Sequence, residues 1–122
     1  NNQIGFLVVD GAADIYAVTD NGGTETKTDT GVDFSDGSVT GSTITNDRRL
    51  GFIVRGTGQV EFYVDRKLVT TTVSTTTIPT AQMTTWLAAV SGEAVANVVD
   101  CDYLLTVAQR TTDGMVQYNK QP

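Results

Sequence analysis

The chain has 122 residues, of which 39% are hydrophobic, with a net charge of −6, one cysteine and no histidine. This length is that of one domain, and the acidic balance argues against binding DNA, RNA or an anionic membrane, because phosphate affinity depends on clustered Lys and Arg. His-dependent triads, His-ligated zinc, intrachain disulfides and Cys-based metal sites are excluded, and no apolar run approaches the roughly 20 residues that span a bilayer.

The first part of the chain predicts three strands. Ile4–Asp10 is a short apolar run ending in the turn signal Asp10-Gly11, which indicates a strand buried on both faces. Asp14–Thr19 alternates in hydrophobicity and is expected to be its partner strand. Asp20–Gly23 predicts a turn, because Asn and Gly accept positive φ. Thr24–Thr30 alternates threonine with charge, which is typical of an exposed or edge strand.

The middle of the chain predicts a loop followed by a hairpin. Gly31–Asn46 has the Gly, Ser, Asp and Asn content of a loop with short strand pieces. Arg49–Arg55 reads as a strand, and Gly56–Gly58 turns it into the next one. Gln59–Thr72 alternates apolar and polar residues before a charged turn and is β-branched after it, which predicts two strands joined tightly. Ile78-Pro79 ends the ladder, because proline has no N–H.

The remainder is less regular. Thr80–Val90 carries a helical stripe, but its threonines favour a short helical turn leading to a strand over Trp86–Val90, with the tryptophan in the core. Ala94–Val99 and Tyr103–Gln109 predict a bent final strand, and Thr111–Pro122 a polar tail. About eight short strands with Gly-rich turns are typical of an all-β sandwich or jelly roll. We expect Cys101 to be a small buried hydrophobe.

Two pairs of carboxylates have the composition of a glycosidase site, in which one acid protonates the leaving group and another acts as base or nucleophile. The pairs are Glu61 with Asp65 and Asp100 with Asp102. A solvated sheet face and a turn cap explain the same residues, and no tight carboxylate cluster lies on one strand. We therefore predict no catalytic residue and no enzymatic activity.

A calcium site and a sugar-stacking platform are the remaining candidates. Asp33 and Asp36, with nearby serines, offer oxygen ligands for Ca²⁺, but Asp and Ser that bond their own backbone in a turn account for them equally well. We expect no cofactor, with calcium as the alternative. The aromatic residues available to stack on sugars are Tyr16, Tyr63, Trp86, Tyr103 and Tyr118. Tyr63 is the ligand-binding candidate, because it lies on the face opposite Phe62.

Several motifs together resemble the second half of a concanavalin A-like jelly roll, the lectin and glucanase sandwich. They are the VEFYVD hairpin at Val60–Asp65 with Leu68-Val69, the Ile78-Pro79 linker, VDCDY at Val99–Tyr103 with the apolar Leu104–Val107, and IGF at Ile4–Phe6. This version of the domain occurs in structural proteins of tailed phages and related viruses. Arg66 departs from the family pattern, which has glycine in this turn, so we expect a hairpin that is one residue longer or strained.

The resemblance implies an antiparallel two-sheet jelly-roll sandwich over residues 1–110, as the latter part of the domain, and a polar tail over 111–122. A complete domain of this family has more strands than this chain predicts. An absent N-terminal section, in a chain that begins at Asn1 rather than Met, or a neighbouring subunit would supply them. The family's catalytic acids and metal-ligand loop have no recognisable counterpart.

The expected function is that of a virion structural module, either a capsid decoration or a tail protein on the virion surface. It would act by packing against other virion proteins or copies of itself, since open strand edges are templates for a partner. The alternative is a carbohydrate-binding or adhesion module on a virion or cell surface, with glycans stacked on exposed tyrosines.

Overall fold

The computed structural model describes residues 1–9, 12–34, 39–40, 43–44, 48–88 and 101–108. The chain divides into two compact units, Asn1–Met83 and Thr84–Pro122. All strands found in the described residues belong to the first unit, and no helix occurs in the described part of either. The predicted domain over residues 1–110 stays a prediction, and the tail 111–122 lies outside the described residues.

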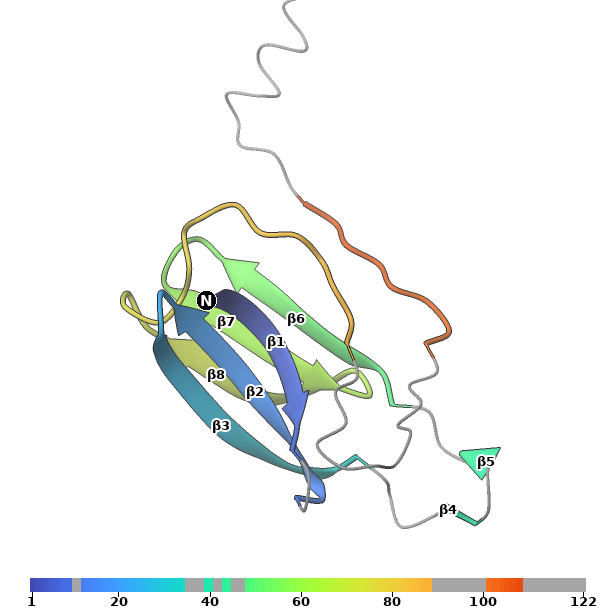
Figure 1. Cartoon of the computed structure of the whole chain (residues 1–122). Helices are drawn as coiled ribbons and strands as arrows, with labels where there is room; N and C mark the ends of the chain where they lie inside the picture. Colours follow the sequence, from blue (N-terminus) through green and yellow to red (C-terminus); the bar gives the residue numbers. More distant parts are fainter. Residues whose placement is uncertain (10–11, 35–38, 41–42, 45–47, 89–100, 109–122) are drawn as a thin grey trace, which may run out of the picture. The chain divides into compact units, whose positions relative to one another are not determined.

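The first sheet consists of β1 (Asn2–Val8), β2 (Asp14–Asn21) and β3 (Thr24–Asp33), antiparallel in the order β1-β2-β3 (Figure 1). These are the three strands expected from the sequence. Gly22 and Gly23 form the β2–β3 turn with φ of 64° and 94°, which glycine adopts without a steric penalty. The turn predicted at Asp10-Gly11 lies outside the described residues.

The second sheet consists of β6 (Leu50–Arg55), β7 (Gln59–Val64) and β8 (Lys67–Val73), again antiparallel and in sequence order. Val64 pairs with Lys67, so the β7–β8 turn is the two residues Asp65 and Arg66, at φ of 50° and 69°. The turn is therefore strained, because only glycine takes this conformation freely. The β8 arm also holds one extra residue, Val69, where the register shifts between Phe62 and Tyr63.

A small third pair lies in the predicted loop. β4 (Val39–Thr40) and β5 (Thr43–Ile44) are antiparallel and two residues long each. They match the expectation of short strand pieces between residues 31 and 46.

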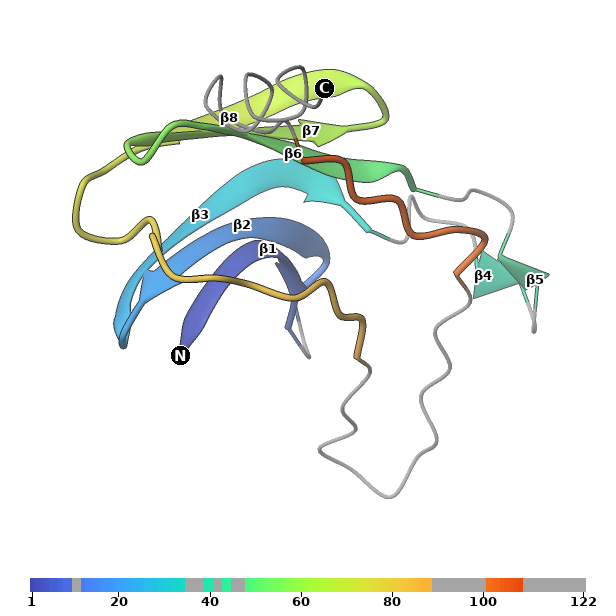
Figure 2. The ribbon, with the colours of Figure 1, turned by 90° about the horizontal axis from the view of Figure 1, so that it is seen from above.

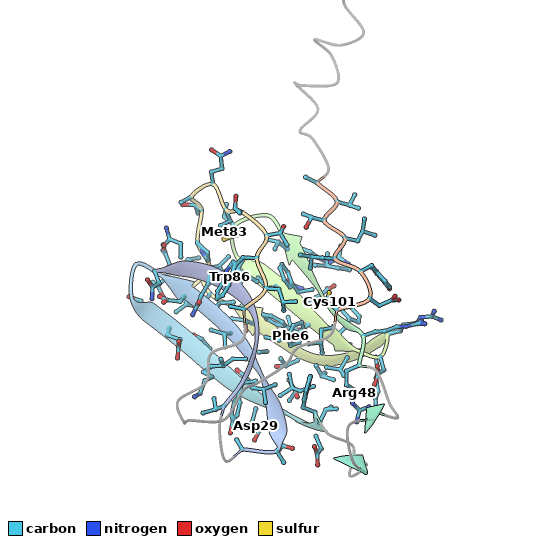
Figure 3. The ribbon with its side chains drawn as sticks, turned by 45° about the vertical axis from the view of Figure 1, so that its right-hand side comes forward. Phe6, Asp29, Arg48, Met83, Trp86 and Cys101 are labelled. Carbon is cyan, nitrogen blue, oxygen red and sulfur yellow. The ribbon has the colours of Figure 1, made fainter. Side chains whose placement is uncertain are left out.

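The two larger sheets face each other across one core, in a β-sandwich-like arrangement (Figure 2). Phe62 and Val60 of β7 pack with Ala17 of β2 and with Ile78, all of them at most 1% exposed. Phe6 of β1 meets the Phe62 ring edge to face, with centroids 5.4 Å apart, and lies between the sheets (Figure 3). Burying a phenylalanine in this way contributes roughly 1.5–3 kcal/mol.

The segment after β8 returns across the end of the first sheet. Ile78 and Pro79 are buried, and the Thr77 hydroxyl lies 3.1 Å from the buried Thr19 hydroxyl. Thr26 donates a hydrogen bond of 3.2 Å to the same Thr77 oxygen. These hydroxyls satisfy one another where the sandwich closes, so burying them leaves no unpaired polar group there.

Several expectations for the last third of the chain are wrong. Residues 80–88 contain neither a helical turn nor a strand, and 103–108 are not a strand. Trp86 is 66% exposed instead of lying in the core, and Cys101 is exposed instead of buried. The apolar spacing was present, but a strand also needs a neighbour for its N–H and C=O groups. The predicted strand over Ala94–Val99 lies outside the described residues.

The prediction that the first strand is buried on both faces is also wrong. Leu7 and Val8 in β1 and the adjoining Val9 are 41%, 42% and 36% exposed. β1 is the terminal strand of its sheet, so a neighbouring strand covers only one of its flanks. Side chains on both of its faces are therefore partly accessible along the open flank.

Candidate functional site

A polar cluster lies on the outer face of the second sheet, centred on Glu61. One carboxylate oxygen of Glu61, Oε1, accepts hydrogen bonds from Arg55 Nε at 2.9 Å and Gln59 Nε2 at 3.2 Å. The other, Oε2, accepts the Tyr63 hydroxyl proton at 3.0 Å. Strand pairing positions the cluster, because Arg55 is paired with Gln59 and β7 alternates its side chains between faces.

Hydrogen bonds in this cluster shift the pKa values of Glu61 and Tyr63 in opposite directions. The hydrogen bond from Arg55, followed by that from Tyr63, lowers the pKa of Glu61. Because Tyr63 gives its proton to a carboxylate, its own pKa is raised. Glu61 is therefore held ionised and is a poor proton donor at neutral pH, contrary to what a glycosidase acid requires.

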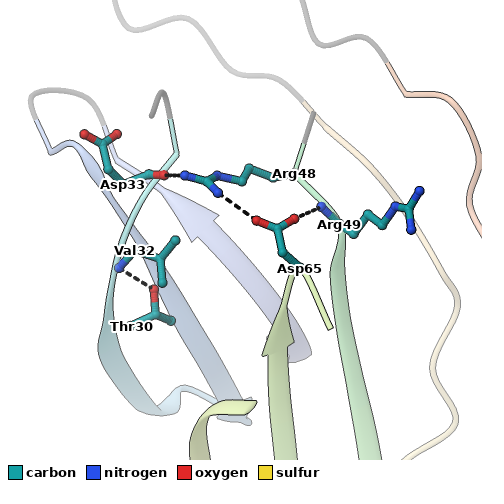
Figure 4. A network of polar contacts seen from close by, with 6 residues as sticks. All are labelled: Thr30, Val32, Asp33, Arg48, Arg49 and Asp65. Carbon is teal, nitrogen blue, oxygen red and sulfur yellow. Dashed lines mark hydrogen bonds and ion pairs between the residues drawn. The ribbon is translucent and has the colours of Figure 1, made fainter. Parts of the chain in front are cut away.

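A second polar network joins the two sheets at the opposite end of β7 (Figure 4). Asp65 Oδ2 accepts a 2.7 Å hydrogen bond from Arg48 Nη1, and Asp65 Oδ1 accepts the Arg49 backbone N–H at 2.9 Å. Arg48 Nη2 also donates to the backbone oxygen of Asp33, at the end of β3, at 2.9 Å. The Arg49 N–H, then Arg48, lowers the pKa of Asp65. The network fixes the strained turn and links it to the first sheet.

Of the two carboxylate pairs considered in the sequence, only Glu61 with Asp65 lies in the described residues, and these two belong to separate networks. Glu61 and Asp65 each bond to their own separate partners. Asp100 lies outside the described residues, so its pairing with the exposed Asp102 stays a prediction. Within the described residues, no three His, Cys, Asp or Glu side chains are grouped as metal ligands. Asp33 offers its backbone oxygen to Arg48, and Asp36 lies outside the described residues.

The two candidate stacking tyrosines of the first unit lie on different sheets. Tyr16 and Tyr63 lie on the outer faces of their sheets, because the adjacent Ala17 and Phe62 face the core. Lys27 Nζ lies 4.8 Å from the centre of the Tyr16 ring. Tyr63 is half-buried. Tyr103 is 66% exposed and belongs to the second unit, while Tyr118 lies outside the described residues.

The feature that sequence reasoning missed is an uncovered apolar strand, Leu50–Arg55, which we call the β6 edge. Leu50, Phe52 and Val54 pair with the buried Val64, Phe62 and Val60, so they lie on the core-facing side of the sheet. They are nevertheless 40%, 43% and 41% exposed. β6 is the terminal strand of its sheet in the described part of the chain, so this apolar row continues to an open border.

The opposite border of the sandwich has a different character. β3 lies beside β8 there, and its inward side chains are threonines while its outward ones are charged. The inward residues are Thr26, Thr28 and Thr30, and the outward ones are Glu25, Lys27 and Asp29. A charged edge strand resists pairing with another chain, so this border is protected and the β6 edge is not.

No family model matches the chain, and neither a curated protein nor a solved structure is significantly similar to it. A search of the described residues for a helix with the length and apolar character to cross a membrane finds none.

Proposed function

We propose that the protein is a structural module of a tailed-phage-like virion, a capsid decoration or tail protein that acts through protein–protein packing. The observation that carries the proposal is the β6 edge, whose core-facing Leu50, Phe52 and Val54 are about two-fifths exposed. An apolar terminal strand that carries charge only at its end, as β6 does at Arg55, is a surface on which another protein adds a strand. Its partners are other virion proteins or copies of the same chain.

We assign the two sheets to the latter part of a concanavalin A-like jelly roll at the virion surface. The VEFYVD hairpin with its two-residue turn, the buried Ile78-Pro79 linker and the facing antiparallel sheets support this assignment. The net charge of −6 also suits a module that must not adhere to packaged nucleic acid.

The module acts by packing and carries out no reaction. The carboxylates of Glu61 and Asp65 support this part of the proposal. Each forms an ion pair with an arginine and accepts a further hydrogen bond. Their lowered pKa values favour the ionised form. Neither is prepared to donate a proton near neutral pH.

Size in solution tests the proposed function. Light scattering coupled to size-exclusion chromatography, and native mass spectrometry, are expected to show assemblies larger than the 122-residue monomer in a concentration-dependent way. A monomer at all accessible concentrations, with no binding to virus particles on co-sedimentation, contradicts the proposal.

A second candidate function is carbohydrate binding, which the cluster on the outer face favours. Tyr63 presents a ring beside Glu61, Arg55 and Gln59, and such a combination can stack on a sugar and bond its hydroxyls. A glycan array probed with the wild type and Tyr63→Ala, with and without calcium, tests it. Hits that vanish in Tyr63→Ala support this candidate, and an array without hits rejects it.

A further inference from the structure

We propose that the β6 edge binds Asp102–Ala108 of a second copy as an added antiparallel strand. We call Asp102–Ala108 the donor segment, because it would supply the added strand. This inference rests on the proposed function, because it names the contact through which copies assemble. It follows from the hydrogen-bonding direction of β6, the exposure of the donor segment, and the charges at the ends of both.

The hydrogen-bonding groups of β6 alternate in direction. Asp65 N donates to Arg49 O at 2.8 Å, so residue 49 bonds to the β7 side of the sheet. In an antiparallel pair the bonded positions recur every second residue, so Gly51 and Ile53 also bond toward β7. The N–H and C=O groups of Leu50, Phe52 and Val54 therefore point to the open border, where an added strand would bond.

The donor segment has one apolar face at strand spacing but no ladder, and Leu104 on its other face is apolar as well and 60% exposed. Tyr103, Leu105 and Val107 are 66%, 74% and 82% exposed, and none of residues 101–108 is in a strand. The hydroxyl of Thr106, on the other face of the segment, lies 2.6 Å from the hydroxyl of Thr85. The described part of the second unit contains no strand that could pair with these apolar residues, and we assign a second copy of the chain as their partner.

Charge selects one antiparallel register. When Asp102 lies opposite Arg55, opposite charges meet at one end of the pairing. The apolar residues of the two segments then share the core-facing side, in the pairs Tyr103–Val54, Leu105–Phe52 and Val107–Leu50. The pairing would continue the inner face of the sheet and cover its exposed apolar row.

Pairing of β6 with β6 of the second copy is disfavoured by the same reasoning. The two-fold arrangement that keeps the apolar faces together places Phe52 opposite itself and Arg49 opposite Arg55 at both ends. Like charges directly opposite one another destabilise a strand pair. The acidic start of Asp102–Ala108 removes that repulsion at one end.

Two variants disrupt the two halves of the proposed contact separately, one at the β6 edge and one in the donor segment. Val54→Pro removes an N–H that points to the open border without removing a bond to β7, so the sheet is retained. Leu105→Asp places a charge where the donor meets Phe52. Lys27→Pro is the matched control, because its N–H points outward from the charged β3 border by the same alternation.

The experiment measures assembly by native mass spectrometry for each variant and for an equal mixture of Val54→Pro with Leu105→Asp. Each variant alone is expected to assemble on the order of tenfold or more weakly than the wild type, whereas Lys27→Pro is unchanged. The mixture is expected to form a one-to-one heterodimer, since one copy keeps an intact donor and the other an intact edge. Circular dichroism verifies that all three variants are folded.

The alternative outcomes have distinct meanings. If the mixture stays monomeric while both variants lose thermal stability, the segment pairs within its own chain and the inference is overturned. If both variants assemble like the wild type, the inference fails but the proposed assembly function stands. A wild type that never assembles overturns the inference, and it overturns the proposed function as well if the protein also fails to co-sediment with virus particles.

Discussion

Arg66 occupies a backbone conformation that its side chain disfavours. Its φ of 69° follows that of Asp65 at 50°, and both belong to the two-residue turn that joins β7 to β8. Asp tolerates the left-handed region because its short side chain bonds locally, whereas arginine has no such compensation. The strain at this turn is therefore concentrated at Arg66.

Arg66→Gly is expected to raise the free energy of unfolding. Relief of the left-handed strain, roughly 1–2 kcal/mol, is partly offset by the greater entropy of glycine in the unfolded chain, which leaves about 0.5–1 kcal/mol. Urea denaturation measures the change. Arg66→Ala is the control, since it removes the same charge but keeps Cβ; an equal gain in both variants would contradict the strain argument.

Asp65 makes the stability depend on pH in the acid range. Its pKa is lowered in the folded state by the Arg49 N–H and by Arg48, so its contribution is present above the unfolded pKa of about 3.9 and is lost as the pH falls through the folded pKa. Because its side chain is 41% exposed, we expect a contribution of only about 1 kcal/mol at neutral pH.

Asp65→Asn isolates this contribution, because asparagine tolerates the same φ and retains an acceptor oxygen. The variant is expected to be less stable than the wild type at pH 7, and the difference is expected to shrink below about pH 4 as Asp65 becomes protonated. Denaturation curves between pH 7 and pH 2.5 measure it. A difference that does not change with pH would show that the charge is not responsible.

At the scale of elements, the segment 74–79 fastens the end of β8 to the first sheet. Asn21 Nδ2 donates to the Thr76 backbone oxygen at 3.1 Å, and Thr77 lies between the hydroxyls of Thr19 and Thr26. Ile78 then enters the core. This short segment therefore couples the two sheets in two ways, through its hydrogen bonds to the first sheet and through the packing of Ile78 in the core.

Thr77→Val is expected to lower the free energy of unfolding by about 1–3 kcal/mol, because the buried Thr19 hydroxyl loses a partner. Thr19→Val with Thr77→Val is expected to cost less than the sum of the single changes, since the double variant leaves neither of these two hydroxyls unpaired. A double-mutant cycle from urea denaturation tests this coupling. Additive effects of the two substitutions would contradict it.

At the scale of the whole molecule, strand pairing predicts a graded protection of backbone amides. β2 and β7 are the central strands of their sheets, whereas residues 82–88 and 101–108 form no ladder. Hydrogen exchange by mass spectrometry on dilute protein is expected to show slow exchange in β2 and β7 and fast exchange in both of those segments. Slow exchange over residues 103–107 in monomeric protein would contradict the unpaired state of that segment.

The candidate site was predictable only in part. The alternation of Gln59–Val64 correctly placed Tyr63 opposite Phe62, but it could not show that Tyr63 donates to Glu61, because that bond also depends on the local geometry. The exposure of the β6 edge was not predictable either. Leu50, Phe52 and Val54 have the spacing of core residues, and no local signal tells a central strand from a terminal one.

The sequence by itself determined approximately where the six longer strands lie and, for β6 and β7, which side of the strand is apolar, because a period of two follows directly from strand geometry. It also determined the tight turns at Gly22 and Asp65. Only the tertiary structure decided which strands lie at a border and that Tyr103–Ala108 stays unpaired. The physical reason is that a strand exists only if a segment distant in sequence satisfies its N–H and C=O groups, and alternation within the strand carries no record of that partner.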